Sequence, residues 1–306
     1  MGMRSPYSNA CTMTLLALLW IWHAEASPVL RKDRLHGEEV DASGWTAALH
    51  IADNRHDSMS GVSLESLVLD TPSSQNYNLS RKKKSYSQWK QDKILAPILN
   101  QFKNGFFVES GAYDGETHSN SLYYERKGWT GLLVEPGAKY LQIPGKHRKA
   151  WGFHGALSPT RSSMRLHFND SLTVGAHLDT SSTYLVRAEP LETLLKRIDP
   201  NRTSVDFWSL DIEGDEPAVL EATDFSKIKV GVLLIEMNKS RKINKRIKAV
   251  MDKNNFHDLG RTVYVNWKSG HEEYLDHVFI NPSYLAKHGV EMPANLTGLA
   301  KYDPHY

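Results

Sequence analysis

Cysteine is almost absent from this 306-residue chain, since the single one, Cys11, lies in an apolar N-terminal stretch that we interpret as a leader. A mature chain without that stretch has no thiol, which excludes disulfides, a catalytic cysteine and zinc sites built from cysteine. Net charge is also low, because 37 Lys and Arg oppose 35 Asp and Glu, for a formal net charge of +2. This balance gives no reason to expect nucleic acid as a partner.

Long hydrophobic runs are missing beyond the N-terminus. The apolar run 13–22 follows Arg4 and precedes Ala24-Glu25-Ala26, which has the small-x-small spacing that signal peptidase reads. The run is about half the roughly 20 residues that a membrane helix needs, which favours a cleaved signal peptide over 1–26, with an uncleaved anchor as the alternative. We therefore expect a protein of the secretory pathway (the ER or Golgi lumen) or a secreted one, with no membrane span after cleavage.

The rest of the chain divides into a stem and one domain. Residues 27–85 are polar and show no sustained hydrophobic period, which predicts a flexible stem. Residues 86–306 are long enough for a single domain, and a hydrophobic content of 40% can supply its core. Five N-x-S/T sequons agree with passage through a glycosylating compartment: Asn78, Asn169, Asn201, Asn238 and Asn295.

The hydrophobic pattern of residues 86–306 predicts an α/β fold, because short strand-like runs alternate with longer helical ones. The expected strands are 106–110, 131–135, 151–157, 164–168, 205–211 and 230–236. The expected helices are 88–102, 119–127, 191–198, 216–222 and 240–255. The run 164–168 is expected as an antiparallel excursion. The last two strands, 257–265 and 274–280, are expected as an antiparallel pair at the edge of a sheet that is otherwise parallel and covered on both faces.

A glycine-containing turn follows the first expected strand. Gly111 and Gly115 can take positive φ there, although an ordinary tight turn is the alternative. About 20 residues further on, Glu135 ends a strand where a carboxylate can accept both hydroxyls of a ribose, or simply face solvent. The turn is not G-x-G-x-x-G, and it carries Glu109 and Asp114. Such acids disfavour a pyrophosphate and favour a cofactor with a cationic head, such as S-adenosylmethionine.

Six short segments in order sharpen this hypothesis. From Ser85 onward the chain reads SYSQWKQDKIL, FFVESGAYDGETHSN, GWTGLLVEPG, FHGALS, VDFWSLDIEGDEPAVL and IKVGVLLIEMN. Over roughly residues 86–281 the chain resembles the FkbM-type S-adenosylmethionine-dependent methyltransferases. The residues of its motifs are most similar to those of the animal branch that includes the insect Star protein. The resemblance implies a Rossmann-like class I methyltransferase sheet, mostly parallel with an antiparallel edge pair and helices on both faces, with S-adenosylmethionine as cofactor.

The resemblance also implies roles for individual residues. The methionine part of the cofactor would be lined by Glu109, Gly111, Asp114 and Gly115. The ribose would meet Glu135, and the adenine would lie near residues 156–158, that is Ala156 to Ser158.

Candidate catalytic acids end the later strands. Asp211 and Glu213 are one residue apart, so both project to one side if the strand continues. A shared acidic face could hold Mg²⁺, bind a sugar's hydroxyls, or take the proton of a methyl acceptor. We assign the last role to Asp211 first and Glu213 second, with no metal; Glu236 would face the same cleft. Helix capping by the acids that precede Pro217 is the equal alternative.

His118, just after the glycine-containing turn, is a further candidate base, because imidazole titrates near neutrality. A structural histidine at a helix start is its alternative reading. Two functions remain open. The first is an O-methyltransferase of the secretory pathway acting on a hydroxylated acceptor such as a glycan. The second is a Star-like, non-catalytic regulator of ER-to-Golgi export of growth-factor precursors, which binds secretory cargo and keeps the methyltransferase fold.

Overall fold

The computed structural model describes residues 67–80, 82–169, 177–178, 184–237, 240–265, 270, 272–294, 296 and 299–300. The expected signal peptide, most of the expected stem, and the sequons at Asn238 and Asn295 lie outside these residues. Among the helices so described, none combines the length and apolar character of a membrane span.

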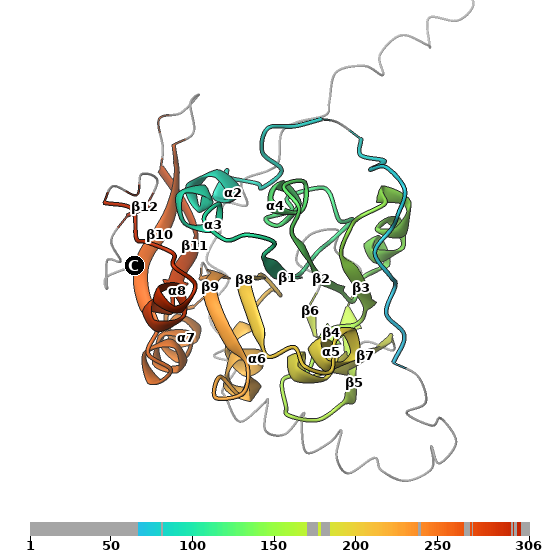
Figure 1. Cartoon of the computed structure of the whole chain (residues 1–306). Helices are drawn as coiled ribbons and strands as arrows, with labels where there is room; N and C mark the ends of the chain where they lie inside the picture. The colour runs from blue at the N-terminus through green and yellow to red at the C-terminus, as the bar shows by residue number, and fades with distance from the viewer. Residues whose placement is uncertain are drawn as a thin grey trace, which may run out of the picture. The chain divides into compact units, whose positions relative to one another are not determined.

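The larger sheet has eight strands in the order β12-β10-β11-β9-β8-β1-β2-β3 (Figure 1). Their bounds are β1 Phe106–Ser110, β2 Thr130–Glu135, β3 Trp151–His154, β8 Ser204–Leu210, β9 Lys229–Glu236, β10 His257–Val265, β11 Glu272–Ile280 and β12 Leu299–Ala300. The five strands from β3 to β9 are parallel, whereas β11 is antiparallel to both β9 and β10. This confirms the predicted mostly parallel sheet with antiparallel strands at one edge.

Strand order reverses at β1. The chain moves outward from β1 to β2 and β3, then returns to place β8 on the other side of β1. In open α/β sheets a ligand crevice forms at such a switch point, beyond the carboxyl ends of the strands. The segments that follow β1, β2, β8 and β9 are therefore the ones to inspect for function.

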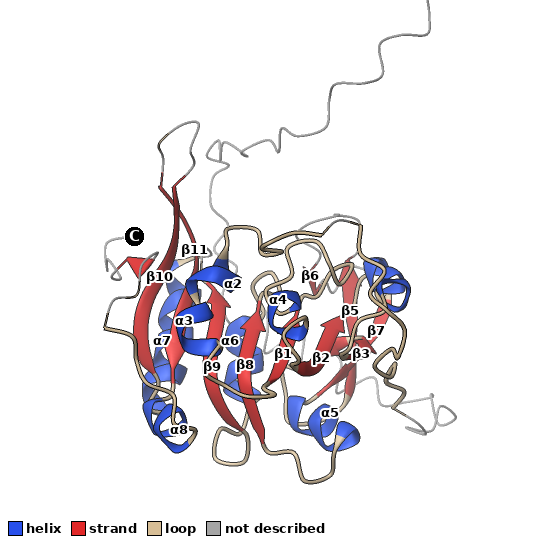
Figure 2. Ribbon diagram, turned by 45° about the horizontal axis from the view of Figure 1, so that its top comes forward, coloured by secondary structure: helices blue, strands red, loops and turns tan. Residues whose placement is uncertain are grey.

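Helices cover both faces of this sheet, as predicted (Figure 2). Their bounds are α2 Gln91–Ile94, α3 Ala96–Leu99, α4 Leu122–Glu125, α5 Leu191–Ile198, α6 Glu216–Ala222, α7 Arg241–Lys253 and α8 Pro282–Lys287, with 3-10 turns at Ala138–Gln142 and Pro144–Lys146. One hydrophobic cluster includes residues of α5, α6 and α7. A second cluster, on the opposite face, includes residues of α3, α4 and α8.

The strands supply both clusters because side chains alternate along them. In β1, Phe106 and Val108 join the first cluster and Phe107 joins the second. In β8, Trp208 joins the first and Phe207 the second. A strand buried on both faces reads as a continuous apolar run, which is why this part of the sheet could be predicted from the sequence.

The helices of the N-terminal half are shorter than expected. The helix predicted over 88–102 divides into α2 and α3, because Pro97 lies in the first turn of α3 and has no N–H for a continuous helix. The helix predicted over 119–127 is reduced to α4. Ser119 and Ser121, just before it, donate their hydroxyls to the buried carboxylate of Glu109.

A smaller sheet follows β3. It has the order β4-β7-β5-β6, with bounds β4 Ala156–Leu157, β5 Met164–Asn169, β6 His177–Leu178 and β7 Leu185–Glu189. The strand predicted over 151–157 is thus two strands, which separate at Gly155. A Cβ on Gly155 would lie 2.5 Å from the carbonyl oxygen of Arg187 on β7, so the glycine lets β7 pass close by. No pattern in the sequence led us to predict β7.

Residues 67–80 of the expected stem run beside β3 (Figure 1). Leu67 joins the first hydrophobic cluster, and Asp70 forms a backbone bridge with Gly152 of β3. The Tyr140 hydroxyl donates to the carboxylate of Asp70 at 2.6 Å. The packed region therefore includes residues that precede residue 86, where the predicted domain begins.

The switch point depends on Gly111, which has φ +84° and whose added Cβ would overlap the backbone carbonyl oxygen of Asp211. Gly128 also has positive φ, +98°, but an added Cβ there meets nothing within 4 Å. We expect Gly111→Ala to lower the free energy of unfolding by about 3 kcal/mol or more, from strain plus overlap. Gly128→Ala, the matched control, should cost about 1 kcal/mol from strain alone. Chemical denaturation measures both, and equal losses would contradict the role given to Gly111.

Candidate functional site

The glycine-containing turn, residues 111–118, joins the ends of three strands. The backbone N–H groups of Gly111 and Ala112 both donate to the carbonyl of Val134 on β2, at 3.0 and 3.1 Å. On the other side, the N–H of Asp211 donates to the carbonyl of Ser110 on β1 at 3.1 Å. Gly111 and Gly115 have φ of +84° and +77°, the positive values that the sequence predicts. The turn is therefore a compact backbone junction at the switch point.

Glu109, at the end of β1, is 3% exposed and fully hydrogen-bonded. It accepts from the hydroxyls of Ser119 and Ser121, at 2.8 and 2.6 Å, and from the N–H of Asn120 at 2.5 Å. Burial raises the pKa of Glu109, against the lowering effect of Arg148 and these donors. In this structure the side chain holds the segment before α4.

The other acids of the turn are also used within the protein. Asp114 accepts from the N–H groups of Glu116 and Thr117, at 2.8 and 2.6 Å, and from the Thr117 hydroxyl at 2.8 Å. Glu116 pairs with Lys146 at 2.9 Å. Both acids therefore stabilise the turn itself, a role for which the sequence offered no evidence.

Arg148 supplies a buried positive charge beside this turn, and our sequence reasoning missed it. It is 3% exposed and donates to the carbonyl of Gly115, to the Ser121 hydroxyl at 3.0 Å and to Glu125 at 2.9 Å. A buried guanidinium needs such partners, because desolvating an unpaired charge is costly. In the sequence Arg148 stands in the basic run Lys146-His147-Arg148-Lys149, which is indistinguishable from a solvated surface segment.

Glu135, the expected ribose ligand, connects two loops. One carboxylate oxygen accepts from the N–H of Tyr113 at 2.8 Å, and the other accepts from the N–H of Gly137 at 2.7 Å. Glu135 is thus placed at the carboxyl end of β2 by the same bonds that hold the turn.

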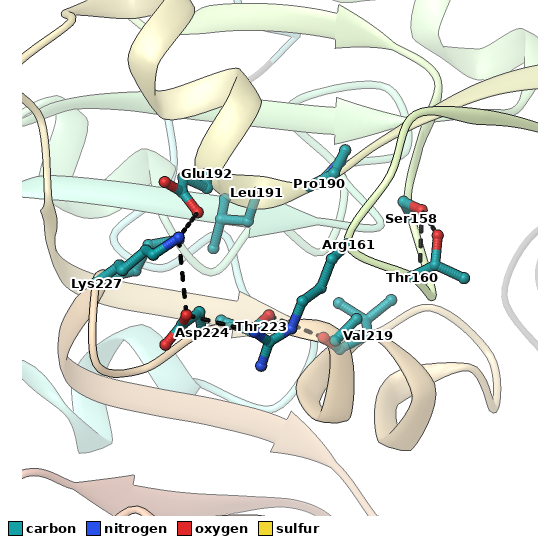
Figure 3. Close-up of a pocket in the computed structure, with 12 residues that line it drawn as sticks. Ser158, Thr160, Arg161, Pro190, Leu191, Glu192, Val219, Thr223, Asp224 and Lys227 are labelled. Atoms are coloured by element: carbon teal, nitrogen blue, oxygen red, sulfur yellow. Dashed lines mark hydrogen bonds and ion pairs between the residues drawn. The ribbon is translucent and has the colours of Figure 1, made fainter.

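Ala156 and Ser158, expected near the adenine, belong to the smaller sheet and the turn after β4. Ser158 lines a pocket of about 120 Å³ between the start of α5 and the last half of α6 (Figure 3). Its hydroxyl donates to the carbonyl of Ser162 at 2.7 Å. The pocket's charges pair with one another: Arg161 with Asp224 at 3.5 Å, and Lys227 with Glu192 at 3.9 Å.

A cluster of carboxylates lies beyond β8 and β9. One oxygen from each of Asp211, Glu216 and Glu236 lies within 4.8 Å of the others. Burial, then the negative charges of Glu236, Asp276 and Glu213, raise the pKa of Asp211 well above its usual range. Burial likewise raises the pKa of Glu216. Of these residues we expected Asp211 and Glu236 in one cleft, and the structure brings them together.

Glu213 does not lie on a continued strand. The strand β8 ends at Leu210, and Glu213 has φ +62°, so alternation does not place it beside Asp211. It acts on Asp211 through its charge alone. The alternative interpretation, helix capping by these acids, is only partly met. Asp215, the N-cap of α6, makes no side-chain capping hydrogen bond. Glu216 instead accepts from the N–H groups of Ile212 and Gly214, just before the helix, at 2.9 and 3.1 Å.

His118 is exposed and has φ +59°. Its backbone pairs with Ser87 in an isolated bridge. Within the described residues no hydrogen bond or ion pair joins its ring to Asp211. The structure therefore places His118 at the far end of the turn, apart from the carboxylates.

Comparison with known proteins supports the resemblance. Residues 109–260 match the family model described as the methyltransferase FkbM domain. This range includes both the glycine-containing turn and the carboxylate cluster. No curated protein matches the chain significantly.

Several solved methyltransferase structures are similar to this chain. The precorrin-6y C5,15-methyltransferase of Geobacter metallireducens is 11% identical, over 66% of this chain and 91% of its own, with a TM-score of 0.39. An O-methyltransferase of Bacillus cereus in complex with S-adenosylhomocysteine is 9% identical, over 78% and 91%, with a TM-score of 0.37. Magnesium protoporphyrin IX methyltransferase of Synechocystis is 10% identical, over 62% and 76%, with a TM-score of 0.34. At such scores the fold assignment rests on the strand order itself.

Asp276 on β11 gives the site a pH dependence. Burial raises its pKa to about 7, helped by the charge of Glu236 and opposed by a hydrogen bond from Gln91 at 2.7 Å. Between about pH 4 and pH 7 the folded protein keeps a proton that the unfolded chain releases, so its stability should fall as pH rises. Asp276→Asn should reduce this slope, with a gain of at most roughly 4 kcal/mol at pH 7, and the buried acids Asp211, Glu216 and Glu109 should carry the rest.

Urea unfolding from pH 4 to 8 in the presence of EDTA measures the slope. The exposed Asp252→Asn on α7 is the control and should retain the wild-type profile. A slope in Asp276→Asn as steep as that of the wild type would contradict the contribution of Asp276.

Proposed function

We propose that residues 86–306 form an S-adenosylmethionine-dependent O-methyltransferase of the secretory pathway, acting on a hydroxylated acceptor such as a glycan. The observation that carries the proposal is the position of Asp211 inside the matched FkbM domain. It follows β8 directly at the switch point of the sheet, in backbone contact with the glycine-containing turn. A basic group and a donor-binding turn thus meet at one edge.

The residues present fit the donor. Glu135 ends β2 at the carboxyl edge of the sheet, and two backbone N–H groups fix the position of its carboxylate. The turn at Gly111 and Gly115 brings backbone close to that carboxylate. Ala156 and Ser158 remain our proposed adenine contacts, and Glu109, Asp114 and the two glycines our proposed contacts for the methionine part. When bound, S-adenosylmethionine supplies an activated methyl group, which the acceptor oxygen binds as the sulfur–carbon bond breaks.

Asp211 is the proposed base. Its carboxylate takes the proton of the acceptor hydroxyl while the oxygen–carbon bond forms. A raised pKa makes a carboxylate a stronger base at neutral pH, so the burial and neighbouring charges that act on Asp211 favour this role. Glu213 contributes negative charge and remains the second candidate, whereas the position of His118 favours Asp211 over the imidazole.

A second candidate is the Star-like regulator that binds secretory cargo without catalysis. It is favoured by the internal use of Glu109, Asp114 and Glu116, since each has a structural partner that a scaffold without a donor would also retain. Function does not follow from fold alone. Donor binding separates the two candidates.

Calorimetric titration of the full chain with S-adenosylhomocysteine tests the donor site. We expect 1:1 binding, weakened at least about 10-fold in Glu135→Ala, because two ribose hydrogen bonds are lost. Glu221→Ala, an exposed glutamate on α6 paired with Arg246, is the matched control and should bind as wild type. Since Glu135 also holds two loops, thermal unfolding must show that its variant is folded. A folded wild type that binds no S-adenosylhomocysteine would leave the cargo-binding candidate.

Asp211→Asn tests the base. We expect methyl transfer to fall at least about 100-fold while donor affinity stays within about 3-fold, because the lost group acts on the acceptor's proton. Glu213→Gln should lose less than about 5-fold. Transfer of a labelled methyl group to a panel of glycans and hydroxylated small molecules measures both. Full methyl-transfer activity of Asp211→Asn would show that another residue is the base.

A further inference from the structure

We propose that Asp211, Glu216 and Glu236 form a binding site for one oxygen-preferring divalent cation, of the Mg²⁺, Mn²⁺ or Ca²⁺ class. From sequence alone we assign no metal here. The three side chains come from separate places: the end of β8, the first turn of α6 and the end of β9. One oxygen from each lies within 4.8 Å of the other two, close enough for a single ion to contact all three.

The second observation concerns hydrogen bonding at Glu216, which is fully buried. Its Oε1 accepts from the N–H groups of Ile212 and Gly214. Its Oε2 is enclosed and has no hydrogen-bond partner among the described residues. The Oδ1 atom of Asp211 is in the same condition. Enclosed carboxylate oxygens without donors are costly, and a cation satisfies several of them at once.

Among the described residues, neither Asp211 nor Glu216 takes part in any of the ion pairs. This contrasts with the buried acid Glu125, which pairs with Arg148 at 2.9 Å. Carboxylate oxygens are hard ligands, which excludes a preference for soft metals. Asp211 is only partly buried, so an ion and its remaining waters can enter from that side.

A cation here would have a use in the proposed reaction. The open side of the ion offers positions for acceptor oxygens, which favours acceptors with two neighbouring oxygen groups. This use rests on the proposed methyl transfer, whereas binding of the ion does not.

Mn²⁺ titration of the full chain, followed by electron paramagnetic resonance without any methyl donor, tests the site. We expect one Mn²⁺ per chain, displaced by excess Mg²⁺ or Ca²⁺, and at least 10-fold weaker binding in Glu216→Gln and in Glu236→Gln. Asp224→Asn, an acid of the pocket in Figure 3 that pairs with Arg161 and Lys227, is the control and should bind as wild type.

Thermal unfolding gives a second measurement that does not depend on activity. In EDTA, Glu216→Gln should unfold at or above the wild-type temperature, because it removes a repelling charge and keeps an acceptor for Ile212 and Gly214. Added Mn²⁺ should raise the unfolding temperature of the wild type and not that of Glu216→Gln.

Two outcomes would overturn the cation site. A wild type that binds no ion at millimolar concentration would mean that the carboxylates hold only protons. Mn²⁺ affinities of Glu216→Gln and Glu236→Gln that equal that of the wild type would mean that the ion lies elsewhere. Mn²⁺ binding together with no S-adenosylhomocysteine binding would keep the cation site and reject methyl transfer, so the two proposals fail separately.

Discussion

The close approach of Gly111 to the backbone of Asp211 is the constraint on which the site depends. It requires both positive φ and the absence of a side chain at position 111, because any Cβ would overlap the carbonyl oxygen of Asp211. This contact fixes the end of β8 against the turn that follows β1. Since β2 is joined to the same turn through Val134, three strand ends are held as one unit at the switch point.

The acids around this junction fall into two groups that differ in hydrogen bonding. Glu109, Asp114 and Glu135 accept donors from nearby loops, so their charge is largely used to hold backbone in place. Asp211 and Glu216 each retain an enclosed oxygen without a donor. Carboxylates that repel one another and lack hydrogen-bond donors bind a proton or a cation more strongly. The lack of donors therefore distinguishes an acid that can take part in chemistry from one with a structural role.

Both proposed roles of the cluster follow from its low solvation. A buried carboxylate with acidic neighbours binds a proton more strongly, which suits a base near neutral pH, and for the same reason it attracts a divalent ion. Arg148 does not cancel this field, because its contacts are with Gly115, Ser121 and Glu125 on the opposite side of the turn. The buried guanidinium of Arg148 thus pairs with Glu125 and not with Asp211 or Glu216.

Much of the architecture was determined by the sequence itself. Runs such as Phe106 to Val108, buried on both faces, predict parallel strands, and the positive φ of Gly111 and Gly115 follows from their place after one. Local pattern could not show that Glu109 and Asp114 would be consumed by hydrogen bonds, that β8 would end at Leu210, or that Glu216 would turn toward Asp211 and Glu236. Those facts depend on contacts between residues far apart in the chain, and burial and pairing, which set the chemistry of a carboxylate, exist only after the strands have met.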